Sequence, residues 1–278
     1  MITRLAQQRV IDGRTLRYCV QGNNGDPTLV LLHGAGAHAH WWDALIPFFA
    51  DGWCLIVPDL RGHGESDWAD SPYLIEHFYD DLRALLDALA IERVVLIGHS
   101  MGGRIATWFA AHQPKRARGL ALLDTRMAGL KPDRVDQWRG VTVGDGPRRT
   151  YPSRERALAA FRVIPPEPGI APEIVAQLAE HAIVQLGPKE WAMRFDRRVL
   201  HLAGSRLIDI FDLLPRIPCP AIVLEGADST VTTPDECSRA AAALGHCPVR
   251  RFAGAHHFML VQPAAVGEAL RQFLLSLR

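Results

Sequence analysis

Ser100 lies at the centre of VVLIGHSMGGRIATWFAAH, the stretch of residues 94–112. The spacing around it is G-x-S-x-G, between an apolar run typical of a strand and a stretch typical of a helix. A very tight strand-to-helix turn strains its central residue, and side chains at positions 98 and 102 would collide there, so glycine is needed at both. Such a turn projects the central hydroxyl above the sheet. We therefore predict that Ser100 is a nucleophile and not an ordinary turn residue.

A second loop can supply hydrogen-bond donors to the same reaction. His33-Gly34-Ala35-Gly36 follows an early apolar run. A loop of this composition can turn a backbone N–H towards the nucleophile, and the N-terminus of the helix after Ser100 offers another. We predict that the backbone N–H groups of Ala35 and Met101 stabilise a developing oxyanion.

The elements that must hold these residues alternate along the chain. Asp12-Gly13 predicts a hairpin turn between two strands near the N-terminus. Alternation of buried strands with helices indicates an α/β fold, with a mostly parallel sheet covered on both faces. The predicted strands are 8–11, 15–21, 28–32, 53–57, 94–97, 120–123, 221–224 and 248–252. The predicted helices are 41–49, 74–89, 102–112, 234–244 and 264–277.

The alternation stops in the middle of the chain. Residues 127–215 contain many prolines and glycines and no clear strand. Helical patches are predicted at 153–161, 172–185 and 200–212. We therefore expect a core formed by residues 1–126 and 216–278, interrupted by a mainly helical cap at 127–215.

Composition and charge exclude several classes of function. The chain of 278 residues is 48% hydrophobic with a formal net charge of +1, which gives no electrostatic case for nucleic acid or a membrane surface. No signal-peptide core and no apolar run of transmembrane length occur, and the five cysteines are scattered. We expect a cytoplasmic protein with free thiols. The pair His38 and His40 is interpreted as part of a loop, and no metal site is expected.

Four motifs follow one another in a characteristic order. They are HGAG at 33–36, DLRGHGES at 59–66, GHSMGG at 98–103 and GAHHFMLVQP at 254–263. Together they resemble the α/β-hydrolase superfamily over about residues 8–126 and 216–278. The resemblance implies the α/β-hydrolase fold, Ser100 as its nucleophile and a helical cap after the sixth core strand. It also implies an acid and then a histidine later in the chain, and it gives Asp59, His63 and His99 structural roles.

The resemblance leaves two candidates for the catalytic histidine, because His256 and His257 are adjacent on the loop after the last predicted strand. Family members commonly have a proline at a fixed distance after this histidine, and counting back from Pro263 favours His256. Counting from Gly254, as in the family's G-x-G-H pattern, favours His257. We favour His256 as the base.

The acid also has two candidates. The family usually carries it after the seventh strand, where this sequence has Ser229 at the expected position and Asp228 one residue earlier. Some related hydrolases carry it after the sixth strand, and here the apolar run 120–123 ends at Asp124. An aspartate at the carboxyl end of a strand is well placed for chemistry. We favour Asp124, and Asp228 stays the alternative.

Acyl transfer to water is the chemistry that these residues imply. The resembling dehalogenases and epoxide hydrolases have aspartate at the elbow, so Ser100 favours hydrolysis of a small-molecule carboxylic ester, with no cofactor. Trp42 and Trp138 are candidates for lining the substrate pocket. Alternatives are a lactonase, a thioesterase, a perhydrolase, a carbon–carbon bond hydrolase, or a non-catalytic receptor for a small ligand. The sequence does not indicate an oligomeric state.

Overall fold

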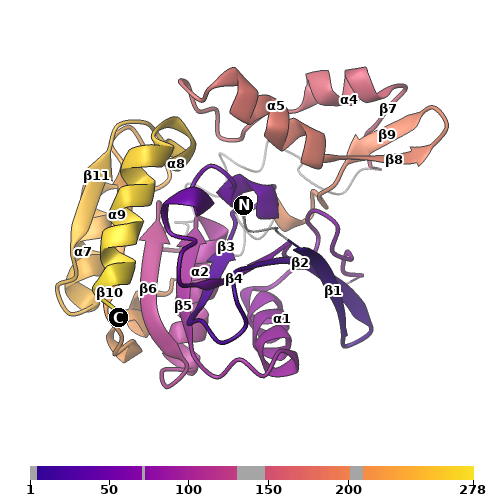
Figure 1. Ribbon diagram of the computed structural model, residues 1–278. Helices are drawn as coiled ribbons and strands as arrows, with labels where there is room; N and C mark the ends of the chain where they lie inside the picture. Colours follow the sequence, from indigo (N-terminus) through magenta and orange to yellow (C-terminus); the bar gives the residue numbers. More distant parts are fainter. Residues whose placement is uncertain (1–4, 71–72, 130–147, 201–208) are drawn as a thin grey trace.

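An eight-stranded sheet forms the centre of the computed structural model, which describes residues 5–70, 73–129, 148–200 and 209–278 (Figure 1). The strand order is β1-β2-β4-β3-β5-β6-β10-β11. The β1–β2 and β2–β4 pairs are antiparallel and the other pairs are parallel. The strands are β1 (Leu5–Ile11), β2 (Arg14–Gln21), β3 (Thr28–Leu32), β4 (Cys54–Pro58), β5 (Val94–His99), β6 (Ala117–Leu123), β10 (Ala221–Gly226) and β11 (Val249–Phe252). The predicted, mostly parallel α/β sheet is confirmed.

Helices cover both faces of this sheet. Side chains of α1 (Ile75–Ala88), α2 (Met101–His112) and α7 (Pro234–Ala243) belong to one buried cluster. The opposite cluster contains side chains of α8 (Phe258–Val261) and α9 (Pro263–Leu275) and of the short 3-10 helices η1 (Ala39–Trp42) and η2 (Ile46–Phe48). Successive residues of β3 alternate between the clusters, as the period of a strand requires. This explains why its sequence, TLVLL, is apolar without interruption.

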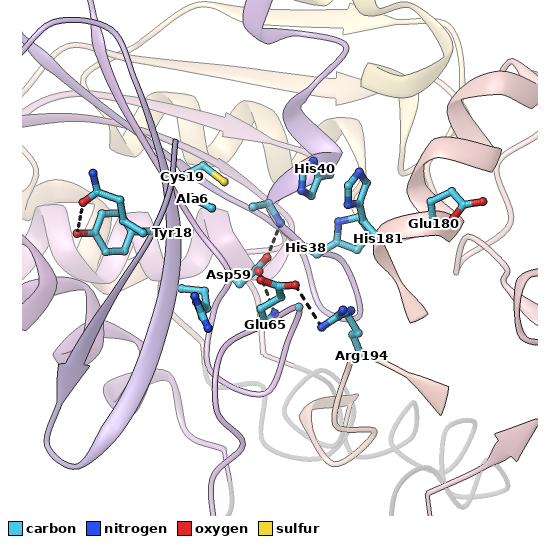
Figure 2. A pocket seen from close by; sticks show the side chains of 14 residues that line it. Ala6, Tyr18, Cys19, His38, His40, Asp59, Glu65, Glu180, His181 and Arg194 are labelled. Carbon is cyan, nitrogen blue, oxygen red and sulfur yellow. Dashed lines mark hydrogen bonds and ion pairs between the residues drawn. The ribbon is translucent and has the colours of Figure 1, made fainter. Parts of the chain in front are cut away.

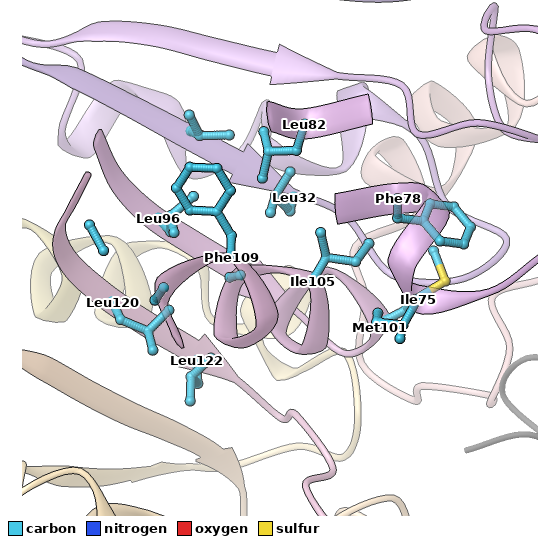
Figure 3. Close-up of a cluster of buried hydrophobic side chains, with 14 of the residues drawn as sticks. Leu32, Ile75, Phe78, Leu82, Leu96, Met101, Ile105, Phe109, Leu120 and Leu122 are labelled. Atoms are coloured by element: carbon cyan, nitrogen blue, oxygen red, sulfur yellow. The ribbon is translucent and has the colours of Figure 1, made fainter. Parts of the chain in front are cut away.

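The first cluster holds α2, the helix that follows Ser100, against the sheet. Ile105 and Phe109 of α2 are fully buried and lie over Leu32, Leu96 and Leu120 of three neighbouring strands (Figure 3). A buried side chain of this size stabilises the fold by roughly 1.5–3 kcal/mol relative to an exposed one. The N-terminus of α2 is therefore fixed rigidly relative to the carboxyl ends of β3, β5 and β6.

The helix predicted at 172–185 ends at residue 181, where a strand soon follows, and the helix predicted at 41–49 is replaced. Residues 41–49 were expected to form a helix, but the chain makes the two 3-10 segments η1 and η2. Their backbone bonds join residues three apart, as in Trp41 N–H to His38 O and Leu45 N–H to Trp42 O. Pro47 has no N–H to continue an α-helical ladder, which accounts for the break.

The segment between β6 and η3 (Phe211–Arg216) carries elements separate from the main sheet, set above it in Figure 1. They are α4 (Arg154–Ala160), α5 (Pro172–His181) and the three antiparallel strands β7 (Thr150–Tyr151), β9 (Glu190–Met193) and β8 (Ile183–Gly187). The expectation of no strand in this segment was wrong, because these strands are short and exposed and lack a buried apolar run. These elements follow β6, where the cap was expected, and much of the predicted helix 200–212 lies outside the described residues. None of the described helices combines the length and apolar character needed to cross a lipid bilayer.

Candidate active site

The turn at Ser100 has the backbone geometry of a strained elbow. Ser100 has φ 54° and ψ −118°, a region that residues other than glycine rarely adopt. Its N–H donates to Leu123 O of the neighbouring strand at 2.9 Å. A Cβ atom at Gly98 would lie 2.5 Å from the carbonyl of Gly102, and one at Gly102 would lie 2.1 Å from Leu32 O. The collision predicted at positions 98 and 102 is confirmed.

Asp124 is the carboxylate that meets a histidine. It follows β6, which pairs with β5 of the elbow, and its side chain is fully buried. Its Oδ2 lies 2.6 Å from His256 Nδ1 and also accepts a hydrogen bond from the Ser229 hydroxyl at 2.6 Å. Its Oδ1 accepts from the Thr232 hydroxyl at 2.9 Å and from the Gly226 N–H at 3.3 Å. Buried carboxylates need such partners, and Asp124 has four.

These contacts keep Asp124 ionised. Burial by itself would raise the pKa of the carboxyl, but hydrogen bonds and charge interactions with His256, and hydrogen bonds from Ser229 and Thr232, outweigh it. The pKa of Asp124 is therefore held below its usual value. An ionised carboxylate at Nδ1 fixes the proton of His256 on that nitrogen and leaves the lone pair on Nε2.

Asp228 has a different environment. Its side chain is exposed and makes no hydrogen bond to any residue in the described part of the chain, although its backbone N–H donates to Gly254 O at 2.9 Å. Ser229, one residue later, is the side chain that reaches Asp124. The structure thus brings Asp124 and His256 together, and it does not bring Asp228 to either histidine.

The loop after β11 is fixed by the elbow and by the cap segment. His99, which precedes Ser100, donates from Nε2 to His256 O at 2.9 Å. The Glu167 carboxylate of the cap segment accepts from the N–H groups of Ala255 and His257 at 2.8 and 2.7 Å. Nε2 of His257 donates to the backbone carbonyl of Ile164 at 3.2 Å. His256 is thereby held against Asp124 and His99, whereas His257 is bound to the cap segment.

The amide groups expected to form the oxyanion site lie close to Ser100. A Cβ atom at Gly34 would lie 3.2 Å from Cβ of Ser100, so the backbone before Ala35 passes next to the serine. The N–H groups of Ala35 and Met101 donate to no acceptor within the described residues. The Met101 side chain is buried in the first core cluster, which fixes the direction of its N–H. Both amides remain available to a ligand.

Buried histidines and an aspartate shape the loop around Ala35. Leu60 N–H donates to His33 Nε2 at 3.0 Å, and Gly36 N–H donates to His63 Nε2 at 3.0 Å. Asp59 accepts from the N–H of Ala39 at 2.7 Å. The DLRGHGES loop therefore supports the HGAG loop through side-chain to backbone bonds, in agreement with the scaffold role given to Asp59 and His63.

Two of these histidines should make the stability of the fold depend on pH. Burial lowers the pKa of His33 to about 4 and that of His63 to about 3, from 6.5. Between pH 6.5 and those values the unfolded chain binds protons that the folded chain does not, so stability falls as pH falls. In the pH range where only the unfolded form is protonated, each histidine lowers the free energy of unfolding by about 1.4 kcal/mol per pH unit. Urea unfolding should give a smaller free energy at about pH 5 than at about pH 7.5; equal values would contradict this.

Of the two aromatic candidates for the pocket, the structure describes only Trp42. Trp42 is almost fully buried in the second core cluster, packed among side chains of η1, α8 and α9. Trp138 lies outside the described residues. Trp41, next to Trp42, contacts the ring of His257, with 4.9 Å between the ring centroids. The substrate-binding role of Trp42 and Trp138 therefore stays a prediction.

A cavity of about 250 Å³ lies where the core meets the cap segment (Figure 2). Its lining includes His38 and Asp59 from the core and Glu180 from α5, but none of Ser100, Asp124 and His256. His40 stacks on His181 of α5 with ring centroids 3.4 Å apart. Arg194 faces Glu65 at 3.4 Å. These contacts join the cap segment to the core beside the HGAG loop.

Sequence reasoning missed three residues of the site. Ser229 and Thr232 bond to the carboxylate of Asp124, and Glu167 bonds to the histidine loop. A signal existed for Ser229, because it occupies the position where the family usually carries its acid. No local pattern marks Glu167, whose partners are 88 and 90 residues away in the chain.

The fold and the residues around Ser100 can now be compared with those of known proteins. A model of the α/β-hydrolase fold matches residues 27–163. Together with the strand order and the elbow, this match shows that the chain has the α/β-hydrolase fold.

Individual relatives give a closer comparison. The chain is 29% identical to 3-oxoadipate enol-lactonase 2 of Acinetobacter baylyi, over 92% of this chain and 91% of that protein. It is 27% identical to a fluoroacetate dehalogenase of Burkholderia sp., over 98% and 95%. The solved structure of a thermophilic esterase from Thermogutta terrifontis is similar at a TM-score of 0.75 and 26% identity, over 99% of both chains.

Proposed function

We propose that this protein is a serine hydrolase that cleaves a small-molecule carboxylic ester through an acyl-enzyme on Ser100. The observation that carries the proposal is the 2.6 Å contact between His256 Nδ1 and the buried carboxylate of Asp124. That contact leaves Nε2 of His256 as the nitrogen available to a serine at the elbow. No hydrogen bond joins Ser100 to His256 within the described residues, and such bonds are often loose until substrate is bound.

In the proposed reaction, His256 acts first as a base and then as an acid. Nε2 of His256 takes the Ser100 proton as Oγ attacks the ester carbonyl carbon, and the oxyanion accepts hydrogen bonds from the Ala35 and Met101 amides. The carbon–oxygen bond to the leaving alkoxide breaks, and the alkoxide takes the proton from His256. Water then attacks the acyl-enzyme by the same route and releases the acid and Ser100. Asp124 stabilises the imidazolium in both halves.

Serine at the elbow argues against dehalogenation in this chain. Attack of a serine on a carbon–halogen bond would leave an ether, which has no carbonyl for water to attack. Attack on an ester leaves a second ester that water can hydrolyse. The similarity to a fluoroacetate dehalogenase therefore supports a shared fold more than a shared reaction.

A cyclic ester is a second candidate substrate. The similarity to an enol-lactonase extends over nine-tenths of both chains. Opening a lactone uses the same attack by Ser100, and the leaving oxygen stays tethered to the acyl group. The same residues would act on both kinds of ester, and the shape of the pocket would determine which kind is bound.

A labelling experiment combined with a substrate panel tests the proposal. Purified protein is assayed with p-nitrophenyl esters of increasing acyl length and with lactones, before and after treatment with a fluorophosphonate. We expect turnover of at least one ester or lactone, abolished in proportion to labelling of the peptide that contains Ser100. Ligand binding with neither turnover nor labelling would contradict the proposal and favour a receptor.

A further inference from the structure

Three histidine rings meet beside the elbow, although the proposed reaction uses one of them. His99 ends β5, and His256 and His257 follow β11. All three side chains are buried, with at most 5% of any residue exposed. The ring centroids lie 4.6, 4.7 and 5.2 Å apart, and no two rings are stacked. One ring nitrogen of each residue lies within 4.8 Å of those of the other two.

Each ring has one nitrogen engaged by an oxygen atom. Nε2 of His99 faces the backbone carbonyl of His256, and Nε2 of His257 faces that of Ile164. A carbonyl can only accept, so both nitrogens carry the proton. Nδ1 of His256 faces the carboxylate of Asp124 and carries its proton for the same reason. The lone pairs are therefore on Nδ1 of His99, Nδ1 of His257 and Nε2 of His256.

Two of these lone pairs have no partner among the described residues. Nδ1 of His99 and Nδ1 of His257 are buried and without a hydrogen bond to any described residue. A buried polar atom left unpaired costs roughly 1–3 kcal/mol. Gly34 keeps space open beside one of them, because a Cβ there would lie 3.0 Å from Nδ1 of His99. The cluster thus offers acceptors and no donors to whatever enters that space.

We propose that His99, His256 and His257 form a binding site for a divalent transition-metal ion that prefers imidazole ligands, such as Zn²⁺. We further propose that the ion inhibits the hydrolase. The inhibition rests on the proposed function, whereas the binding does not.

The arrangement has the features of a three-histidine metal site. Histidine ligands usually donate their second ring N–H to a carboxylate or a backbone carbonyl, and all three rings do so here. Zn–N bonds of about 2.0–2.1 Å require nitrogens roughly 3.4 Å apart in a tetrahedral site. The distances between the ring nitrogens, which are up to 4.8 Å here, must therefore shorten when the ion binds. His257 has the longest of the three hydrogen bonds, 3.2 Å, so it is the ring most easily moved.

Metal binding and ester hydrolysis would exclude each other. The Nε2 lone pair of His256 that accepts the Ser100 proton is the same pair that would bind the ion. While the ion is bound, Ser100 has no base. Ions of this kind should therefore inhibit reversibly, and a chelator should restore activity.

The test measures binding and activity separately. Titration of the protein with Zn²⁺ by calorimetry, and with Co²⁺ by its visible absorption, should show one ion per chain. His257→Phe keeps an aromatic ring against Trp41 and removes a ligand, and His257→Gln is a second variant in case the first does not fold. Each of the two His257 variants should weaken Zn²⁺ binding by about 10- to 100-fold. His112→Gln, at an exposed histidine on α2, is the matched control and should bind as the unmodified protein does.

The outcomes separate the two proposals. Failure of the unmodified protein to bind Zn²⁺, or equal affinity in a folded His257 variant, would overturn the metal site. Zn²⁺ inhibition that EDTA reverses, and that needs a higher Zn²⁺ concentration in the His257 variants, would support the inhibitory role. If Zn²⁺ binds but does not inhibit a measurable esterase activity, the inhibitory role is overturned. If Zn²⁺ binds as expected but no ester is cleaved with or without EDTA, the site stands and the proposed function fails.

Discussion

Replacing Ser100 with alanine should lower kcat for the best ester substrate by about 10⁴-fold or more. The variant lacks the oxygen that attacks the carbonyl, while His256 and the Ala35 and Met101 amides remain. The fold should tolerate the change, because the Ser100 hydroxyl makes no hydrogen bond within the described residues. Alanine also has a Cβ, so the strain at φ 54° stays the same. Steady-state kinetics with one p-nitrophenyl ester, together with a thermal melt, measure both effects.

A second serine supplies the control for this variant. Ser238 is exposed on α7, where its hydroxyl donates to Pro234 O at 2.8 Å. Ser238→Ala should leave kcat and the melting temperature nearly unchanged. A Ser100→Ala protein that hydrolyses the ester at the original rate would show that the activity arises elsewhere.

The elbow could be predicted because its causes are local. Gly98 and Gly102 are close to Ser100 in the chain, and the collisions that demand glycine involve Gly102 itself and the adjacent strand β3. The sheet was predictable for a similar reason, since strands buried on both faces produce uninterrupted apolar runs. In such cases a few neighbouring residue types determine the backbone.

The sequence favours Asp124 but leaves Asp228 open as the acid, because the choice between them depends on distant contacts. Asp124 and Asp228 both follow apolar strands, and both could approach a histidine on the next loop. The structure separates them through Ser229, which turns towards Asp124, and through the parallel pairing of β6 with β10. Neither relation has a local pattern. The short strands of the cap segment were missed because their side chains bury little surface and leave no periodic signal.

The position of Ser229 suggests how this site differs from the more usual arrangement. The family usually carries its acid at the place of Ser229, and here a hydroxyl at that place bonds to the oxygen of Asp124 that meets His256. Two strand ends therefore converge on one point. The carboxylate comes from β6, and the loop after β10 contributes hydroxyl donors that keep it ionised.

Asp124→Asn should therefore lower kcat by about 10⁴-fold, whereas Asp228→Asn should change it by less than about threefold. An amide at position 124 can donate to Nδ1 of His256, which would place the ring proton on Nε2 and remove the base. Asp228 is exposed and contacts neither histidine, so replacing it should affect only the turn in which it lies. Kinetics on one ester compare the two proteins, and thermal melts show whether each is folded.

A transplanted carboxylate sharpens this test. In the Asp124→Asn background, Ser229→Asp puts a longer, charged side chain where a hydroxyl already lies 2.6 Å from the side chain of residue 124. If the loss comes from the missing carboxylate, the double variant should recover at least about tenfold in kcat. In the otherwise unmodified protein, Ser229→Asp should lower activity, because two neighbouring carboxylates raise the pKa of one of them. A large loss in Asp228→Asn, or a mild effect of Asp124→Asn, would show that the acid has been assigned to the wrong strand.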